Sequence, residues 1–382
     1  GWINNNFRLL FTSGPFALAE TFTNALTSGV PLVTLDRPFP SAVGKTAAFN
    51  VSGANPHLGQ PTMYQWNLTL ERQVHGNWGI RLSYVGAINK DVWYVRDLTR
   101  PAASLIPFSA SRRNYSMYNA VSYIDKGGND SYHALQVGFT HTYSSGLSVM
   151  GSFQWVSQIT DVWDKANQET TFGQALENPY CRSCQKGKSY LVDPLDFRMN
   201  FIYDLPFGKG RQFASNVNRV VNGIIGNWAI AGLVDAKSGR PNTVFFTGRD
   251  TSNTNLVGGR ADVVSNCNMR PGNGKTAPYL NIACFAIPQN GTFGNAGISP
   301  FRNPGMYGVT GTIYKYFPLP RENATLRING MFGTAFNHPT WNTVGNNISQ
   351  PGNFGQLMND GANPMEYSGT ARYILLQAQL QF

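Results

Sequence analysis

Charged residues are scarce in this chain of 382 residues, at 13% of the total, which is about half of the share usual in soluble domains. Long apolar runs are also missing, since none approaches the ~18 residues that a membrane-spanning helix needs. These absences exclude a helical membrane protein. They leave open a β-barrel, whose short amphipathic strands keep the mean hydropathy low, and the mean hydropathy here is −0.25.

Clusters of basic residues are lacking as well, although the net charge is +10. The densest basic pair is Arg112–Arg113, and no nucleic-acid motif accompanies it. Nucleic-acid binding normally needs basic side chains gathered on one patch or stripe. We therefore expect no nucleic-acid partner, and scattered solvated charge is the simplest interpretation.

Motifs of catalysis are absent from the sequence: there is no Gly-x-Ser-x-Gly elbow, P-loop or dinucleotide fingerprint. Two acidic pairs, Asp125/Asp130 and Asp161/Asp164, fall in or near predicted loops, where solvated carboxylates are favoured over a calcium site. Four loop aromatics are candidates for stacking on a ligand, although packing among loops is favoured: Tyr115, Tyr118, Trp163 and Tyr180. We expect no enzymatic activity, no cofactor and no metal site.

Cysteine is rare, and the four residues form two local pairs, Cys181/Cys184 and Cys267/Cys284. None of the five histidines lies near either pair in the sequence, which disfavours a metal site built from both residue types. Even, local pairing is typical of disulfides in an oxidising compartment. Loop disulfides are thus the favoured prediction, with metal binding and free thiols as the alternatives.

Alternation of apolar and polar residues is the main positive signal, and it is clearest in the last strand. Ile374, Leu376, Ala378 and Leu380 alternate with glutamine, and the strand ends on Phe382. Alternate side chains of a strand lie on opposite faces, so one face is apolar and the other is polar but uncharged. A transmembrane barrel strand requires this pattern, and a soluble sheet permits it.

The same alternation recurs in four hairpins earlier in the chain. The predicted strand pairs are 66–70 with 78–84, 135–143 with 147–155, 197–205 with 228–234, and 309–317 with 326–332. With the last strand they give about nine strands. Weaker candidates lie at Phe7–Phe11, Val92–Val95 and Thr243–Phe246.

Short and long connections alternate along the chain. Short turns, and one longer turn at 206–225, follow the first strand of each pair, whereas long connections (88–131, 158–195, 238–308 and 334–370) follow the second. Compact soluble domains rarely contain long structureless loops, but outer-membrane barrels carry them on the extracellular side. Within 216–225, apolar residues at three- and four-residue spacing predict one short amphipathic helix, which we expect to pack under the barrel rim.

Several segments, taken in order, resemble a known family. They include Gln65–Arg72, Tyr132–Val137, Tyr203–Arg211 and Gly226–Trp228, followed by Ser238–Pro241, Gly291–Gly294, Asn303–Gly305 and Phe336–Pro339. No single motif is specific, but their succession across about 60–382 resembles the C-terminal barrel of Oar-like TonB-dependent outer-membrane receptors.

The resemblance implies an all-β, antiparallel transmembrane barrel with long extracellular loops, of which this chain supplies the C-terminal strands of a total of 22. On this basis residues 1–60 are expected to hold a preceding barrel strand and an extracellular loop, and residues 61–382 the C-terminal barrel portion. The C-terminus would be periplasmic, and Phe382, Leu380 and Leu376 would form the signal read by the barrel-assembly machinery.

A receptor of this kind takes up a large or scarce solute, using energy delivered by TonB through a plug domain. No plug and no TonB box are present in this sequence, which suggests a piece of a longer protein. Outer-membrane lipid and lipopolysaccharide are the other expected partners, and the solute is unknown. The alternative is a soluble, β-rich, lectin-like binding module that uses the loop aromatics.

Overall fold

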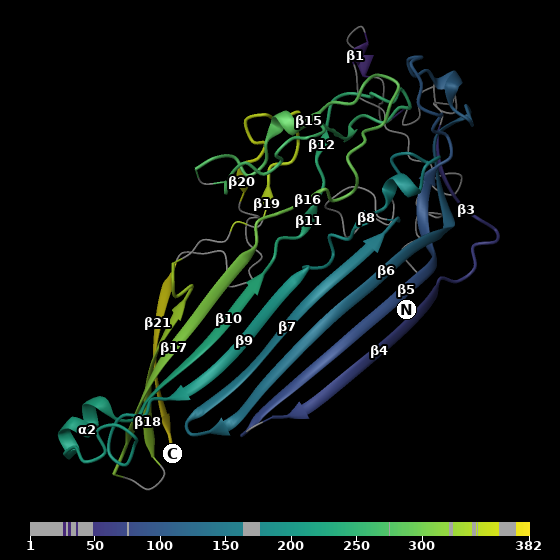
Figure 1. Ribbon diagram of the computed structural model, residues 1–382. Coiled ribbons are helices and arrows are strands. Elements are labelled where there is room, and N and C mark those ends of the chain that lie inside the picture. Colours follow the sequence, from purple (N-terminus) through teal and green to yellow (C-terminus); the bar gives the residue numbers. More distant parts are fainter. Residues whose placement is uncertain are drawn as a thin grey trace.

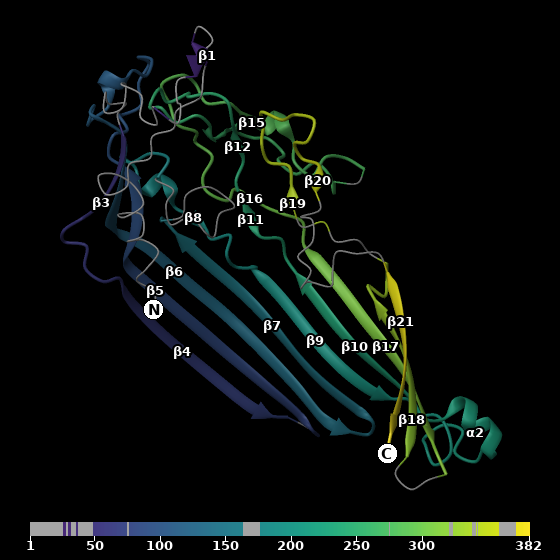
Figure 2. The same ribbon diagram turned by 180° about the vertical axis from the view of Figure 1, so that it is seen from behind.

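The computed structural model describes residues 49–358 and 372–382, apart from gaps at 75, 163–175, 275, 321–323, 338–340 and 342, together with 26–27, 30–31 and 36. Its main feature is a slanted sheet of long strands, with irregular chain gathered beyond one end (Figure 1). The view from behind shows the same division (Figure 2). The candidate strand Phe7–Phe11 lies outside the described residues.

Nine strands succeed one another as neighbours across the sheet, in chain order. They are β4 (Thr62–Gln73), β5 (Trp78–Asp97), β6 (Tyr118–Ser144), β7 (Leu147–Thr160), β9 (Leu195–Asp204), β10 (Trp228–Lys237), β17 (Met306–Pro318), β18 (Thr325–Gly333) and β21 (Tyr373–Gln381). Every neighbouring pair is antiparallel. The predicted all-β antiparallel class is confirmed. The described strands form an open sheet with β4 and β21 at its edges, so barrel closure and the total of 22 strands stay predictions.

The register places apolar side chains from all nine strands on one face, and only a few, such as Met150, Ile202, Leu233 and Leu375, lie on the other. Paired residues share a face of the sheet, and Leu376, Gly330, Ile313 and Ile230 form one such row across four strands. We call this the apolar face and its opposite the polar face. The apolar face includes Trp66, Leu68, Leu70, Ile80, Leu82, Val137, Phe139, Val149, Phe153, Phe197, Phe201, Ile230, Val234, Val309, Ile313, Ile328, Phe332, Leu376 and Leu380.

At the end of the sheet away from the irregular chain, three of the four connections are tight. Between β6 and β7 the two turn residues, Ser145 and Gly146, have φ of 52° and 84°. Two consecutive positive φ values are what a two-residue hairpin turn requires, and glycine adopts them without a steric penalty. The short-turn end therefore follows from local sequence.

Strands β5 and β6 are longer than the alternation predicts. The expected connection 88–131 is wrong, because β5 continues to Asp97 and β6 begins at Tyr118. Asp91 has a φ of 55°, and the register shifts on either side of Val92, so a bulge breaks the alternation there. The weak candidate Val92–Val95 is part of β5. The added length of β5 pairs with that of β6, and the start of β6 also pairs with β3 (Phe49–Ala54), which runs parallel to it.

The long connections form a layer of their own, which we call the loop layer (98–117, 176–194, 238–305 and 334–358). It contains four two-residue strand pairs: β11 (Pro241–Asn242) with β16 (Phe301–Arg302), β12 (Phe245–Phe246) with β13 (Gly259–Arg260), β14 (Asp262–Val263) with β15 (Phe285–Ala286), and β19 (Thr343–Val344) with β20 (Leu357–Met358). Short 3-10 turns stand at Ala110–Arg112, Ser183–Gln185 and Ile282–Cys284. The candidate strand Thr243–Phe246 thus corresponds to a two-residue strand of this layer and not to a member of the main sheet.

The remaining elements are short. β8 (Gly187–Lys188) pairs with the end of β7, and β1 (Leu26–Thr27) pairs with β2 (Val30–Pro31) in a separate two-stranded sheet. The predicted helix is α2 (Arg219–Ile225), in the connection between β9 and β10. The side chains of Val220, Val221 and Ile224 are exposed, so the expected packing of its apolar stripe under the rim is wrong.

Candidate functional site: the polar face and the loop layer

The polar face carries ion pairs between and along its strands. Arg81 pairs with Glu71 on the neighbouring strand. The Arg198 guanidinium contacts Asp196 at 3.1 Å and lies 3.8 Å from Asp235. Such exposed pairs contribute little to stability. Their effect is to keep this face wet and charged.

A shallow hollow of about 680 Å³ lies on the polar face. Its lining combines charged side chains, such as Glu71, Arg81 and Arg198, with apolar ones, such as Met150 and Leu233. Three of its four charged residues are arginines, and the fourth is Glu71. The hollow offers no nucleophile–base arrangement.

The loop layer has a hydrophobic core of its own. Its buried members come from the β10–β17 and β18–β21 connections: Val244, Ala261, Tyr279, Leu280, Cys284, Phe285, Phe301, Val344 and Phe354. Phe285 and Phe354 meet edge to face at 5.7 Å between ring centroids, a favourable aromatic geometry. The two connections therefore fold as one unit and not as independent loops.

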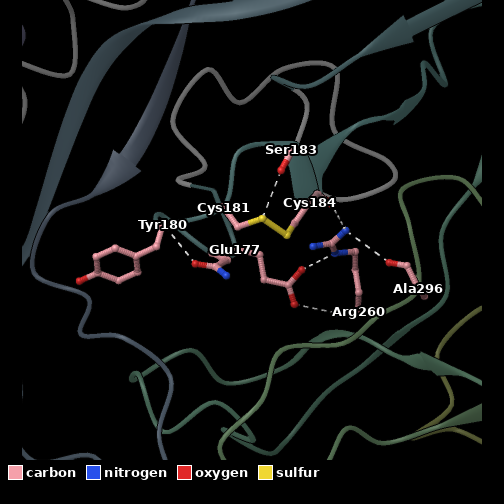
Figure 3. The surroundings of a disulfide bond; sticks show 8 residues. Glu177, Tyr180, Cys181, Ser183, Cys184, Arg260 and Ala296 are labelled. Atoms are coloured by element: carbon pink, nitrogen blue, oxygen red, sulfur yellow. Dashed lines mark hydrogen bonds and ion pairs between the residues drawn. A yellow bond between two sulfur atoms is a disulfide. The ribbon is translucent and has the colours of Figure 1, made fainter.

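Both local cysteine pairs are disulfide-bonded, Cys181 to Cys184 and Cys267 to Cys284. The second bond joins the loop core through the buried Cys284. The first lies beside Glu177 and Arg260, with Ser183 next to Cys181 (Figure 3). Each bond thus restrains a segment that contributes to the layer.

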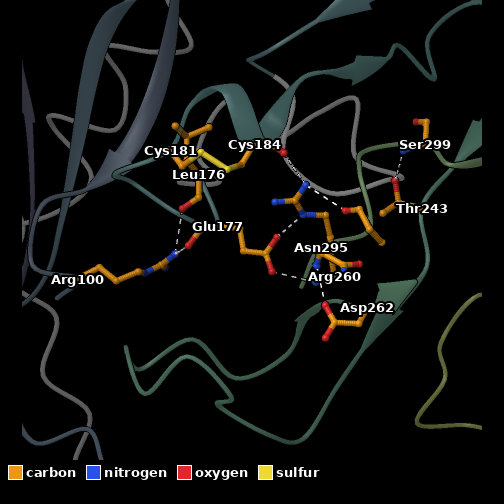
Figure 4. Close-up of polar contacts among 11 residues, drawn as sticks. Arg100, Leu176, Glu177, Cys181, Cys184, Thr243, Arg260, Asp262, Asn295 and Ser299 are labelled. Carbon is orange, nitrogen blue, oxygen red and sulfur yellow. Dashed lines mark hydrogen bonds and ion pairs between the residues drawn. A yellow bond between two sulfur atoms is a disulfide. The ribbon is translucent and has the colours of Figure 1, made fainter. Parts of the chain in front are cut away.

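A buried ion pair joins two different connections of the layer. Glu177 and Arg260 are both almost inaccessible, and Glu177 also accepts a hydrogen bond from the Arg260 backbone N–H at 2.9 Å. The guanidinium further donates to the carbonyl oxygens of Cys184 at 2.7 Å (Figure 4) and Ala296 at 3.3 Å (Figure 3). A buried charge is tolerated only when it is paired and hydrogen-bonded, and both conditions hold for this pair.

A second arginine links the β5–β6 connection to the segment that contains Glu177. Arg100 donates to the carbonyl oxygens of Leu176 at 2.9 Å and Glu177 at 2.7 Å. Arg112 reaches the carbonyl oxygen of Asn253 at 2.8 Å, and Asn253 in turn donates to the carbonyl oxygen of Ser104 at 2.8 Å. Three connections are therefore joined by charge-assisted and amide hydrogen bonds.

Three buried asparagines join the β18–β21 connection, the fourth of the layer, to the β10–β17 connection. Asn346 donates to Asn242 Oδ1 at 3.0 Å and to the Thr243 carbonyl oxygen at 2.7 Å, and Asn242 donates to Asn303 Oδ1 at 3.1 Å. With this network all four connections belong to one hydrogen-bonded layer. The layer therefore presents a fixed outer surface.

Tyr279 is a buried ionisable group of this layer. Its hydroxyl donates to the Arg302 carbonyl oxygen at 2.9 Å. Burial raises the pKa of Tyr279 above its ordinary value, while Arg270, whose guanidinium lies 4.5 Å from the ring centroid, acts in the opposite direction. The side chain serves packing and hydrogen bonding.

The residues flagged from sequence have mixed outcomes. Asp125 and Asp130 are not solvated loop carboxylates but buried members of β6: Asp125 pairs with Arg96 at 2.8 Å, and Asp130 accepts from Asn89 at 3.0 Å and Gln158 at 2.8 Å. Asp161 pairs with Arg182 at 3.3 Å. Their long-range partners could not be read from local sequence.

The aromatic candidates are not gathered into one cage. Tyr115 and Tyr180 are exposed in the loop layer, and the Tyr180 hydroxyl donates to the Arg100 carbonyl oxygen at 2.8 Å while it accepts from Asn114. Tyr118 opens β6. Trp163 and Asp164 lie outside the described residues. Sequence reasoning missed Glu177, Arg260 and Arg100, whose importance rests on contacts made far along the chain.

Two searches within the described part of the chain gave negative results. No group of three or more His, Cys, Asp and Glu side chains there is placed to hold a metal ion. Among the helices described, none combines the length and the apolar character needed to cross a bilayer.

An antiparallel sheet with one apolar and one polar face, and with a folded layer at one end of its strands, is what the wall of a membrane β-barrel requires. The sequence agrees with this class: residues 2–374 match the model of the outer membrane beta barrel domain. The chain belongs to that family. No curated protein matches it.

Three solved structures illustrate how distant the similar folds are. They are the outer membrane transporter YddB from Escherichia coli (9% identity, TM-score 0.43), the FrpB iron transporter from Neisseria meningitidis (9%, 0.38) and the copper transporter OprC (8%, 0.34). The matches cover 88%, 86% and 87% of this chain but only 34%, 32% and 33% of theirs. The chain thus spans about a third of their length.

Proposed function

We propose that this chain forms the C-terminal part of the barrel wall, together with the outer loops, of an Oar-like TonB-dependent outer-membrane receptor. The observation that carries the proposal is the register, which places apolar side chains of nine consecutive strands on one face. Backbone groups in lipid must be satisfied by neighbouring strands, and a continuous antiparallel meander does so. The succession of motifs across the chain supports the receptor subtype.

In this proposal the apolar face contacts lipid and the polar face lines the lumen. The tight turns and Phe382 lie on the periplasmic side, and the loop layer is extracellular. Aromatic residues stand near the short-turn ends of their strands, as Trp78, Trp228 and Phe317 do, which fits an interfacial aromatic girdle. The loop layer then contacts lipopolysaccharide and the solute.

Energy for uptake would come from TonB acting on a plug domain, which we place outside the sequence of this chain. The chain itself supplies the pore wall and a ligand-contacting surface for a large or scarce solute. The lectin-like alternative requires a soluble protein. It is disfavoured by the barrel family of the chain and by the exposure of apolar side chains such as Leu68, Ile80 and Leu376.

Membrane fractionation of the whole protein tests the proposal. The protein should sediment with outer membranes, resist washing with alkali and urea, and be released by detergent. Release by alkali would contradict a membrane wall and favour the soluble module. Binding of the purified receptor to the periplasmic domain of TonB, and loss of that binding when its plug domain is deleted, tests the receptor assignment separately.

Phe382, Leu380 and Leu376 are proposed as the signal for the barrel-assembly machinery. All three are exposed, and Leu376 and Leu380 lie on the apolar face of the edge strand β21. In the whole protein, Phe382→Ala should lower the amount that reaches the outer membrane and leave the melting temperature of the inserted protein nearly unchanged. Normal insertion with a lowered melting temperature would show that Phe382 is only an interfacial aromatic.

A further inference from the structure

The connection between β9 and β10, residues 205–227, stands apart from the tight turns at its end of the sheet. It contains Lys209, Arg211 and Arg219 and no Asp or Glu, so it carries three positive charges and no negative one. All three basic residues are exposed. Figures 1 and 2 place it beside the ends of β17 and β18, opposite the loop layer.

Its apolar side chains are exposed together with the basic ones. In α2, Val220 is 73% and Ile224 is 67% exposed, and their four-residue spacing puts them on the same side of the helix. Phe207 and Phe213 are also exposed, with their ring centroids 5.6 Å apart. An exposed apolar stripe next to basic residues is typical of a helix that lies in a membrane interface.

The structure ties this connection to the apolar face of the sheet. Lys315, in β17, donates to the carbonyl oxygens of Ile224, at 3.2 Å, and of Gly226. Trp228 donates from Nε1 to the same Ile224 oxygen at 2.8 Å, and the Lys315 ammonium lies 5.0 Å from the Trp228 ring centroid. Register pairs Trp228 with Lys315 and Lys315 with Ile328 on the apolar face.

These contacts give the buried Lys315 a function. A lysine on a lipid-facing surface needs partners for its charge, and here the helix carbonyls and two aromatic rings, Trp228 and Phe317, supply them. The C-terminal end of a helix attracts positive charge. Lys315 therefore holds the end of α2 against the side of the sheet that faces lipid, and α2 does not project freely into water.

We propose that residues 205–227 are an interfacial anchor that inserts Val220, Ile224, Phe207 and Phe213 into the phospholipid leaflet at the short-turn end, with Lys209, Arg211 and Arg219 contacting anionic headgroups. The proposal rests on the proposed membrane orientation of the sheet. Lipid is favoured over a protein partner because the tether fixes α2 on the apolar face and because the charge has one sign. Anionic lipid attracts such basic segments next to a membrane.

Nitroxide accessibility in the reconstituted whole protein tests this anchor. The four cysteines of this chain are paired in disulfides, so a cysteine introduced at 220, at 219 or at 68 can be labelled selectively with a maleimide nitroxide. In vesicles of phosphatidylethanolamine and phosphatidylglycerol, the ratio of oxygen to nickel-chelate accessibility should be several-fold higher for Val220→Cys than for Arg219→Cys. Leu68→Cys is the reference for a lipid-facing position.

The three labels separate the two proposals. If position 68 is immersed and position 220 is as aqueous as position 219, the anchor is wrong and the barrel wall stands. If position 68 is also aqueous, the membrane orientation itself is wrong. Loss of access at 220 for both oxygen and the nickel chelate, appearing only after a periplasmic extract is added, would assign the stripe to a protein partner and overturn the lipid proposal.

A charge-reversal pair provides a second readout. Lys209→Glu with Arg211→Glu should lower the immersion of a label at 220 when phosphatidylglycerol is present, and have little effect in purely zwitterionic vesicles. An equal effect in both lipids would show that the basic residues do not read headgroup charge. Heat-modifiable migration in gels verifies that each variant retains its folded barrel.

Discussion

The sheet and the loop layer place apolar side chains of the same type in opposite environments. Leu376 of the sheet is 79% exposed, whereas Leu280 of the loop layer is 1% exposed. Charges show the reverse arrangement: Arg81 and Glu71 of the sheet pair at an open surface, and Arg260 and Glu177 of the loop layer pair in the interior. The comparison indicates that each region is folded for a different solvent, hydrocarbon for one and water for the other.

The two regions also differ in how they specify their structure. Three of the eight pairs of neighbouring strands in the sheet are joined by short turns, and alternation with a period of two sets the faces of all nine strands. The loop layer depends on contacts far apart in the sequence, such as Glu177 with Arg260 and Asn346 with Asn242. Damage should therefore stay within the region where it is made, and the predictions below test that separation.

Breaking the buried ion pair should have the largest effect. Arg260→Ala leaves Glu177 as a buried carboxylate without its partner, and removal of one member of such a pair destabilises by about 3–5 kcal/mol. Hydrogen exchange should rise across 176–194 and 258–263 while the strands of the sheet stay protected. Arg249→Ala, at an exposed arginine of the same connection, is the matched control.

An opposite result would be informative. Unchanged exchange in the loop layer would show that this pair does not hold the connections together. Loss of protection in β6 and β7 as well would show that layer and sheet unfold as one unit, against the separation inferred here.

Charge placed on the two faces of one strand should give the next largest contrast. Leu68 lies on the apolar face, and its neighbour Thr69 faces Ser83 on the polar face at 3.0 Å between hydroxyl oxygens. Near the membrane midplane Leu68→Arg should cost about 2–4 kcal/mol, whereas Thr69→Arg should cost little. Urea unfolding of the protein in bilayers measures both, and equal tolerance would mean that the faces are wrongly assigned.

The success of the sequence-based predictions differs between the same two regions, the sheet and the loop layer. Alternation predicted all nine strands of the sheet and their hairpins, and local spacing indicated both cysteine pairs. The alternation did not predict the continuation of β5 beyond Asp91, where a positive φ and a bulge interrupt the pattern. A bulge changes which face the next residue occupies, so the period is lost although the strand continues.

The loop layer was not predictable in the same way. Its strands are two residues long, such as β12 and β13, and have no period to detect. Arg100 and Arg260 look like ordinary surface arginines in sequence, and only the fold brings them to Glu177. The exposed stripe of α2 shows the converse: its amphipathic pattern was detected, but pattern alone does not tell whether protein or lipid covers it.

Removing the longer disulfide should affect the loop layer alone. Replacing Cys267 and Cys284 with serine releases a cross-link between residues 17 apart, which corresponds to about 3 kcal/mol in the chain-entropy model. The Cys181–Cys184 bond, between residues 3 apart, should matter about half as much. Mapping of peptides under non-reducing conditions should first find both pairs bonded, and free thiols at 267 and 284 in oxidised material would contradict the pairing.

Hydrogen exchange then reports where the loss falls. The segment 261–285 should lose protection, with the sheet unchanged. A barrel that no longer inserts would instead show that the bond is needed during assembly and not only in the finished layer.

The smallest expected effect concerns Tyr279, the buried phenol of the loop core. Tyr279→Phe removes the hydrogen bond to the Arg302 carbonyl oxygen and should cost about 1 kcal/mol. Because burial raises the pKa of Tyr279 in the folded state above its ordinary value of 10.0, its contribution is complete below pH 10 and is lost as the pH rises through the folded-state pKa. Hydrogen exchange of the loop layer, corrected for the intrinsic rate, should therefore accelerate above pH 10 more in the parent protein than in Tyr279→Phe. The sheet serves as the internal reference, since its strands do not contain this group. If the loop layer of both proteins responded identically to pH, the Tyr279 phenol would ionise as readily in the folded layer as in the unfolded one. The core would then be more open to water than its packing indicates.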